Sequence, residues 1–427
     1  MTRQIIPILS ILLGSAFLML AGGMHGLILP IRGSIEGFPT ISLGLLGTGW
    51  AIGFIIGCIY TPRLVRRVGH IRTFGVVAAV SVISVLLMLL MINPTVWIIL
   101  RGLTGFCFAA GAMIVESWLN ERTENQYRGR VFGLYTMVNL AATTIGQMAV
   151  PLADSASFTL FVLAAIFYAL ALVPTAVSKA AAPKPLVETG LDLKILWKNS
   201  PIAAVASFLI GVSNSSFGTL GAVFGERIGL DITTIALMMS LPILAGAAFQ
   251  IPVGYFSDKM DRRIVLVFVM AVAAIIDIFL IVANPTDPVI ILSVVPIFGA
   301  MIYSAYPIIV AHASDSATPG SFIKISGGLL LLYGVGGVIG PIVSGGLMSI
   351  LPQQGLFITT LAAHILIIAY ALVRISLKDA VDTVDKSEFV GMAPGRYATP
   401  ETSVLDPRGM VPALNDIDEG IGGPDQD

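Results

Sequence analysis

The sequence has little charge and almost no cysteine. Only 11% of its 427 residues are Asp, Glu, Lys or Arg, whereas 56% are hydrophobic and the mean hydropathy is +0.92. A soluble fold of this length could not remove so much apolar surface from water, so the composition excludes an ordinary soluble protein. The two cysteines, Cys58 and Cys107, lie inside apolar runs and indicate neither a disulfide framework nor a metal site.

The sequence motifs of common membrane and hydrolytic enzymes are also absent. No Gly-Lys dipeptide occurs, which excludes a Walker A nucleotide site. Neither a His-Glu-x-x-His helix nor a Gly-x-Ser-x-Gly turn occurs. We therefore predict no enzymatic activity, no cofactor, no metal and no nucleic acid partner.

What the sequence does contain is a series of long apolar stretches, each close to the roughly 20 residues with which a helix crosses a bilayer. They lie at about 8–29, 41–61, 73–92, 96–118, 131–152, 157–177, 201–224, 232–256, 264–283, 288–312, 325–349 and 355–375. The first is too long for a signal peptide and has no small-x-small cleavage site. The pattern predicts an all-α integral membrane protein with twelve transmembrane helices.

Basic residues indicate the orientation of these spans. Lysines and arginines gather on alternate loops, and only Arg32 and Arg227 fall on the opposite side. Because basic residues are enriched in cytoplasmic loops, we expect both termini in the cytoplasm and the chain in the cell membrane, plasma or inner.

The chain divides into two six-span halves, 1–177 and 201–376, joined by a lysine- and proline-containing linker, 178–200, expected to be cytoplasmic. Residues 377–427 are acidic, with scattered Pro and Gly, and predict a disordered cytoplasmic tail. A solvated tail is favoured over a partner-binding one. The halves also match weakly at a period of 192–194 residues, which is typical of transporters built from two related bundles. Arg130-x-x-Gly133 and Gly146-Gln147 of the first half match Lys324-x-x-Gly327 and Gly340-Pro341 of the second, and Pro62 and Arg66 match Gly254 and Asp258.

A charged loop follows the eighth span, with the sequence Gly254-Tyr-Phe-Ser-Asp258-Lys259-Met-Asp261-Arg262-Arg263. It resembles the signature loop of the major facilitator superfamily, although Asp261 stands where that family usually has a second glycine. The resemblance implies two pseudo-symmetric six-helix bundles, secondary transport of a small solute and a functional monomer. It also implies that spans 1, 4, 7 and 10 line a central cavity.

The resemblance further implies that this loop is a cytoplasmic gate. Asp258 is expected to meet the start of span 5, where Arg128 and Arg130 lie, because a helix N-terminus stabilises a carboxylate. In the first-half copy of the loop, Arg66 and Arg67 replace the acidic residue. We therefore expect an asymmetric gate held by the second-half loop; the alternative is that these charges only set the topology.

Four titratable residues in the spans expected to line the cavity are candidates for proton coupling. Arg101 begins a small-residue stretch that resembles the family's span-4 motif, and a buried arginine should face protein or water. His25 lies at a similar depth in span 1, where a neighbouring cation can tune its proton affinity. Glu116 ends span 4 and its repeat counterpart lies near His312. The alternative is that each is satisfied by backbone or interfacial contacts.

Polar residues at mid-span depth are candidates for solute binding. These are Asn214, Tyr303, Tyr306 and Gln147, which should face the protein interior because lipid cannot satisfy their hydrogen bonds. Helix–helix contact is the alternative role. Gly340 and Pro341 resemble a glycine-proline motif of exporters but lie in span 11 rather than span 5, and close helix packing explains them.

The stretch from Glu116 to Arg128-Gly-Arg130 resembles, more narrowly, the uncharacterised YcaD-like transporters. This narrower resemblance does not indicate a substrate. We predict a secondary transporter that moves a small solute by alternating access, coupled to protons, with export favoured over import. The alternatives are an uncoupled facilitator or uniporter, an importer, and a transporter-like receptor without net flux.

Overall fold

The computed structural model describes residues 2–124, 127–177, 193–317, 321–382, 386–392, 395–406 and 408. Within these ranges the regular structure is helical and contains no strand. Six long helices form the first half: α1 Thr2–Ile35, α2 Thr40–Val68, α3 His70–Leu90, α4 Pro94–Arg122, α5 Arg128–Met148 and α6 Thr159–Val177. Six form the second: α8 Pro201–Arg227, α9 Ile232–Lys259, α10 Arg262–Ala283, α11 Pro288–Asp315, α12 Phe322–Ile350 and α13 Gly355–Leu377.

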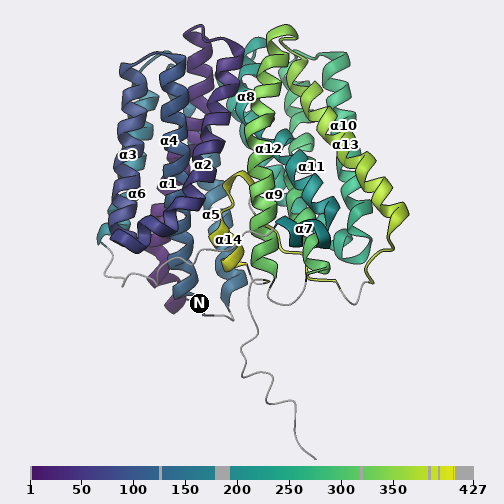
Figure 1. Ribbon diagram of the computed structural model, residues 1–427. Helices are drawn as coiled ribbons and strands as arrows, with labels where there is room; N and C mark the ends of the chain where they lie inside the picture. Colours follow the sequence, from purple (N-terminus) through teal and green to yellow (C-terminus); the bar gives the residue numbers. More distant parts are fainter. Residues whose placement is uncertain are drawn as a thin grey trace, which may run out of the picture.

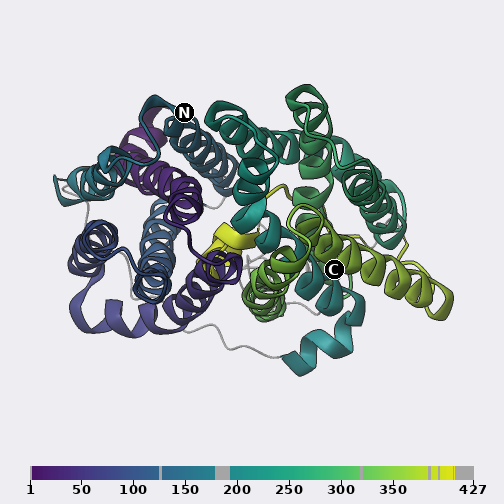
Figure 2. The same ribbon diagram turned by 90° about the horizontal axis from the view of Figure 1, so that it is seen from above.

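Four short helical segments complete the described chain: η2 Val150–Leu152, α7 Leu193–Asn199, η4 Gly395–Tyr397 and α14 Pro400–Leu405. Residues 178–192 of the predicted linker lie outside the described residues. The two sets of long helices stand side by side, and α14 lies between them (Figures 1 and 2). We call the end of the bundle at which α14 lies the tail end, and the opposite end the far end.

Eleven of the long helices in the described chain are apolar enough to cross a membrane, each with an 18-residue window of mean hydropathy 1.2 or more. The twelfth, α5, has the length, but its sequence includes Arg128, Arg130, Asn139 and Gln147. It packs against α1 within its own half and against α9 in the other half, so protein rather than lipid surrounds much of it.

Helix pairing repeats between the halves. α1 packs against α5 and α6, as α8 packs against α12 and α13, and α2 packs against α4 as α9 packs against α11. Across the interface, α2 meets α12 and α5 meets α9. The structure therefore has the two-fold organisation that the weak sequence repeat predicts.

Glycine allows the closest of these approaches. A Cβ atom on Gly53 of α2 would lie 1.8 Å from the carbonyl oxygen of Gly102 in α4, and one on Gly44 would lie 2.2 Å from the carbonyl oxygen of Pro341 in α12. Both distances are well below van der Waals contact, so the helices meet backbone to backbone at these points. The second contact holds α2 against α12 toward the far end. Gly340 makes a similar approach, to Val212 of α8.

Candidate functional site

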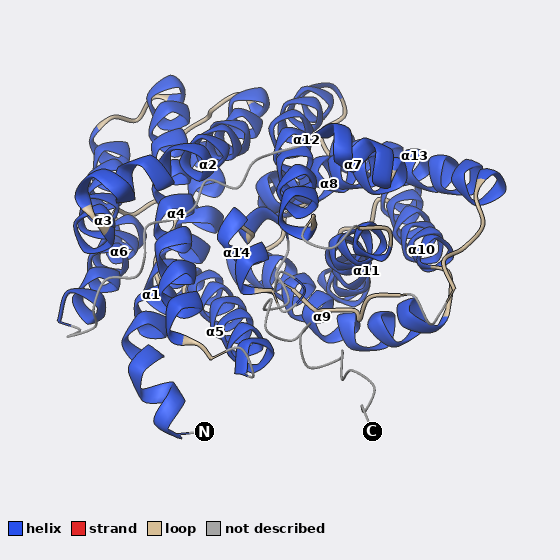
Figure 3. Ribbon diagram, turned by 60° about the horizontal axis from the view of Figure 1, so that its bottom comes forward, coloured by secondary structure: helices blue, strands red, loops and turns tan. Residues whose placement is uncertain are grey.

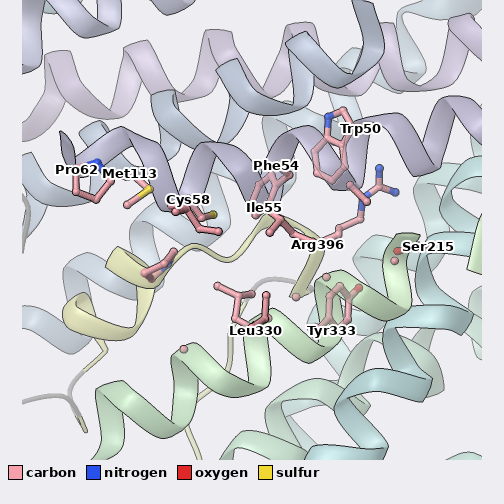
Figure 4. Close-up of a pocket in the computed structure, with 18 of the residues that line it drawn as sticks. Trp50, Phe54, Ile55, Cys58, Pro62, Met113, Ser215, Leu330, Tyr333 and Arg396 are labelled. Atoms are coloured by element: carbon pink, nitrogen blue, oxygen red, sulfur yellow. The ribbon is translucent and has the colours of Figure 1, made fainter. Parts of the chain in front are cut away.

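A cavity of about 170 Å³ lies between the two halves, chiefly between α2 and α12. Its wall is mostly aromatic and aliphatic (Figure 4). The side chains that line it include Trp50, Phe54, Cys58, Met113, Ser215, Leu330 and Tyr333. Three further lining residues, Gly395, Arg396 and Pro400, come from the segment that follows the last long helix.

This position of the C-terminal segment corrects the prediction of a wholly solvated tail. Residues 386–392 and 395–406 of the predicted disordered region 377–427 pack against the helices, and α14 lies between the halves (Figure 3). Arg396 points toward Trp50, with its guanidinium carbon 5.5 Å from the centre of the indole ring (Figure 4). Gly395 lies against the ring of Tyr333, on the opposite wall. Residues 409–427 lie outside the described residues.

Glu116 of α4 bonds to the start of α14. Its buried carboxylate accepts hydrogen bonds from Tyr135 of α5 at 3.0 Å, from Thr402 at 2.9 Å and from Thr399. Thr399 is also the N-cap of α14 and accepts from the backbone N–H of Glu401. Burial and the nearby Glu116 carboxylate raise the pKa of Glu401 to about 8. Glu116 is therefore bonded to helix neighbours, and the tail supplies two of its three donors.

Arg101 and His25 lie together, as their similar depth in the sequence predicts. Arg101 Nη1 lies 3.4 Å from His25 Nδ1, and both side chains are buried. Because a guanidinium only donates, Nδ1 acts as the acceptor and the neutral ring carries its proton on Nε2. Among the described residues, that Nε2 has no hydrogen-bond partner. A second proton on His25 would remove the acceptor, so protonation and the contact with Arg101 exclude one another.

Arg101 also lines a small cavity together with Arg396, Trp50, Gly218 and Thr219. No Asp or Glu lines it, and no carboxylate among the described residues pairs with Arg101. Two guanidinium groups thus share one enclosure without a counter-ion on its wall, which makes the enclosure favourable for an anion.

The predicted gate residues do not make the predicted contact in this conformation. Asp258 pairs with Arg262 one turn further on, at 3.0 Å, rather than with the start of α5. Arg262 also binds Asp315 at 2.7 Å, and Arg263 pairs with Asp261 at 2.7 Å. The charged residues of this loop therefore pair with one another and with Asp315 of α11, all within the second half.

The remaining gate candidates lie around this loop or on exposed helix ends. Lys259 donates to the hydroxyl of Tyr255, and Gly254 lies against the ring of Phe389. Arg128 donates to the carbonyl of Val404 in α14. The side chains of Arg66, Arg67 and Arg130 are exposed.

The other coupling candidate, His312, does not join Arg101 and His25. It lines a small cavity at the tail end together with Asp261, Arg263 and Asp315. The contact partners of Glu116 do not include it. His312 is thus placed with the charged loop.

The four residues predicted to contact solute pack against other parts of the protein. Asn214 donates to the carbonyl of Ile302, at 3.4 Å, and the ring of Tyr306 packs edge-on against that of Tyr333. Gln147 accepts from Ser240 at 2.9 Å and so joins α5 to α9. Tyr303 is buried against α9, where it meets Gly246. None of the four is among the residues that line the main cavity.

The sequence analysis missed a buried polar network inside the second half. His364 of α13 lies 2.7 Å from Asp277 of α10 through Nδ1 and 2.8 Å from Ser213 of α8 through Nε2. Thr360 donates to the other carboxylate oxygen of Asp277 at 2.6 Å. Asp277 and His364 are fully buried. Asp277 could have been noticed in the sequence, because it is an aspartate within the ninth apolar span. An ionisable residue at such a position is a candidate functional residue.

The arrangement of two helix bundles around a central cavity agrees with what the chain matches among known proteins. The sequence model described as Major Facilitator Superfamily matches residues 11–319 and 203–400. The chain belongs to this superfamily. Its twelve-helix transporter fold and the absence of enzymatic activity, both predicted from the sequence, are confirmed by that membership, as is its assignment to multi-pass membrane proteins.

Relatives within the superfamily include uncharacterised transporters of the predicted branch. An MFS-type transporter YcaD from Escherichia fergusonii is 22% identical over 354 residues, which are 82% of this chain and 91% of that protein. The transporter Ent638_1421 from Enterobacter sp. strain 638 is 23% identical over 363 residues, with the same coverage. The narrower resemblance to YcaD-like transporters is therefore confirmed.

Solved superfamily structures share the fold. The nucleoside transporter NupG superposes with a TM-score of 0.74 at 15% identity, covering 87% of this chain and 99% of that one. An inward-facing, unoccupied bacterial homologue of the human lysosomal transporter Spinster superposes with a TM-score of 0.71 at 11% identity, covering 90% and 98%.

Proposed function

We propose that this superfamily member moves a small solute across the cell membrane by alternating access, in exchange for or together with protons, with export favoured. The observation that carries the proposal is a cavity between two bundles that are sealed together at one end. At the far end, Arg227 of α8 donates to Thr40 of α2 and to the carbonyl of Met348, and Gly44 touches α12. Toward the tail end, the described part of the C-terminal segment lies between the halves (Figures 2 and 3).

The distribution of basic residues supports placing the tail end in the cytoplasm. The helices that finish or begin there carry Arg66, Arg122, Lys259 and Lys324 near their ends, whereas Arg32 and Arg227 lie toward the far end. By the positive-inside rule, both termini are then cytoplasmic, and the structure represents a state open to the cytoplasm apart from its tail.

Arg101 is the residue we assign to solute recognition. It is a buried cation without a carboxylate partner in the described chain, beside an aromatic wall formed by Trp50 and Phe54. A solute with an anionic group and a flat apolar part satisfies both features, since buried charge is stabilised by pairing and aromatic faces stack on planar groups.

For proton coupling, two pairs of residues are candidates. His25 is the first, because a proton on its Nδ1 breaks the contact with Arg101 and so alters the solute site directly. The Asp277–His364 pair is the second, because it joins α8, α10 and α13 through a carboxylate and an imidazole, which exchange protons readily. Ser213 connects this pair to α8, which also carries the cavity residue Ser215.

The test is proton movement in proteoliposomes with a pH-sensitive dye inside and candidate solutes outside. The panel should hold aromatic carboxylates, and also nucleosides, because one solved neighbour is described as a nucleoside transporter. Arg101→Ala should abolish a solute-dependent pH change, and His25→Gln and Asp277→Asn tell which pair carries the proton. Glu121→Gln removes an exposed carboxylate from the end of α4 and is the matched control.

Solute flux with no pH change would refute proton coupling and favour an uncoupled facilitator. Binding without flux would favour a receptor. In vesicles of native orientation, accumulation of external solute inside would refute export.

A further inference from the structure

The chain beyond α13 turns back along the second half and forms hydrogen bonds with three of its residues, Met260, Asp315 and Gln250. Lys386 donates to the backbone carbonyl of Met260, and Ser387 donates through both its N–H and its hydroxyl to Asp315. Further in, the side-chain amide of Gln250 forms two hydrogen bonds with the backbone of Met392, at 2.8 and 2.9 Å. A paired amide contact of this kind fixes the direction of a peptide as well as its position.

The same segment then crosses to the first half. Arg396 enters the cavity beside Trp50, the hydroxyls of Thr399 and Thr402 donate to Glu116, and the carbonyl of Val404 accepts from Arg128. One stretch of chain therefore bonds to side chains of α4, α5 and α9 and occupies the space between them.

These contacts also occupy both sides of the predicted gate. Asp258, expected to meet α5, accepts from the backbone N–H of Phe389 at 3.4 Å. Arg128, at the start of α5, donates to Val404 at 3.4 Å. Because the segment lies between the two, Asp258 and α5 cannot approach one another until it leaves.

We propose that the solute cavity is also a binding site for the chain's own C-terminal segment, residues 386–408, which competes with solute and blocks closure of the tail end. The competition rests on the proposed transport function; the binding and release of the segment do not. In the docked state the segment occupies the space next to the enclosure that Arg101 and Arg396 line, so a solute with a flat apolar part cannot enter the cavity without displacing η4 and α14. Transport then requires release of the segment, and whatever binds the released segment activates the transporter.

Cys58 offers a natural reporter for release, because its side chain lines the cavity next to Pro400 and Arg396. In a Cys107→Ala background it is the single thiol of the chain. The full-length protein would be placed in vesicles with the tail end outward. The rate of Cys58 labelling by a membrane-impermeant maleimide then measures how often the segment leaves the cavity.

The test variant is Thr399→Val with Thr402→Val, which removes both hydroxyl donors to Glu116 and keeps side-chain shape. Ser403→Ala, on the same helix, is the matched control, because Ser403 makes no side-chain hydrogen bond in the described structure. Since hydrogen bonds to a charged acceptor are among the stronger ones, we expect labelling to rise about tenfold or more in the double valine protein. Ser403→Ala should label at the background rate.

Two further measurements guard against misfolding of the double variant. Arg396→Ala leaves the contacts with Glu116 intact and should also accelerate labelling. An excess of a synthetic peptide of residues 386–408 should slow labelling of the double valine protein again, whereas a scrambled peptide should not. Equal labelling rates in all variants, or failure of the peptide to protect Cys58, would overturn the proposal. Because no solute is needed, this result stands even if no transported solute is found.

Discussion

Asp258 is the residue at which the gate can be tested most directly. In the structure its carboxylate pairs with Arg262, but it keeps 39% side-chain exposure. In the opposite conformation, closed at the tail end, we expect the same carboxylate to lie at the N-terminus of α5. Asp258→Asn removes the negative charge from both states, so its effect depends on which state gains more from that charge.

The two contributions differ in size. Arg262 is buried and keeps its ion pair with Asp315 when Asp258 is neutralised, so the partly exposed Asp258 carboxylate contributes about 0–1 kcal/mol here, whereas a partly buried carboxylate at a helix N-terminus contributes up to about 2 kcal/mol. The difference, about 1–2 kcal/mol in favour of the closed state, corresponds to a roughly 5- to 30-fold change in the ratio of the two conformations. Asp258→Asn should therefore shift the population toward the state that is open at the tail end.

Distances between spin labels on the two halves measure this population. Gly129 at the start of α5 and Met260 just after α9 are both exposed and lie at the tail ends of helices from opposite halves. In a cysteine-free protein carrying the two valine substitutions in α14, the short distance should lose most of its amplitude on Asp258→Asn. Arg66→Ala is the control and should change the distribution little. Equal effects of the two substitutions would refute an asymmetric gate held by the second-half loop.

Substitutions at three other sites are expected to separate stability from conformational effects. Asp277→Leu leaves His364 buried without its partner and should cost about 3–5 kcal/mol, seen as a lower thermal midpoint in detergent, whereas Asp277→Asn, which keeps one acceptor, should cost less. Gly53→Ala forces a methyl group into the backbone of α4 and should cost about 1–3 kcal/mol by the same assay. Glu401→Gln should remove the pH dependence of docking, so the ratio of the wild-type to the Glu401→Gln labelling rate of Cys58, in which the pH dependence of the thiol reaction itself cancels, should rise between about pH 5 and 8.

The sign of the Glu401 effect follows from its docked pKa of about 8, above the ordinary value of 4.5. The docked segment holds the proton more tightly than the released one, so docking is strongest at low pH and weakens as pH rises from 4.5 toward 8. The charged groups around this carboxyl are Glu116 of α4 and Arg128 of α5, with Asp406 at the end of α14. A ratio of wild-type to Glu401→Gln labelling rates that falls as pH rises would contradict the assignment.

For Gly53, the comparison is Gly346→Ala, because no atom lies within 4 Å of a Cβ built on Gly346. If both substitutions lower the thermal midpoint equally, loss of glycine flexibility rather than the close approach of α2 and α4 determines the cost. For Asp277, equal loss in the asparagine and leucine variants would show that the charge, not the hydrogen bonds, holds the network.

The membrane fold could be predicted from the sequence because its main determinant is local. Each span needs only about 20 consecutive apolar residues, and each loop shows its side by its own basic residues. The proximity of Arg101 and His25 could also be inferred, because both lie at a similar depth in spans that the family resemblance assigns to one cavity. The contact of Asp277 with His364 depends instead on how α10 and α13 rotate against each other, which the hydropathy of two apolar helices does not encode.

The tail shows a different limit of sequence reasoning. Averaged over 377–427 the composition is strongly acidic, which favours a solvated chain. The stretch 386–408, whose described residues pack against the helices, holds three basic and three acidic residues, so it carries no net charge. Moving such a segment out of water costs less free energy than the acidic composition of the whole tail suggests. Hydrogen bonds from Gln250 to the segment's backbone and from its hydroxyl groups to Glu116 offset the rest of this desolvation cost. The net charge of the whole tail therefore misleads. The net charge of a short stretch such as 386–408 is the better sequence criterion for whether that stretch can leave water and bind inside the transporter.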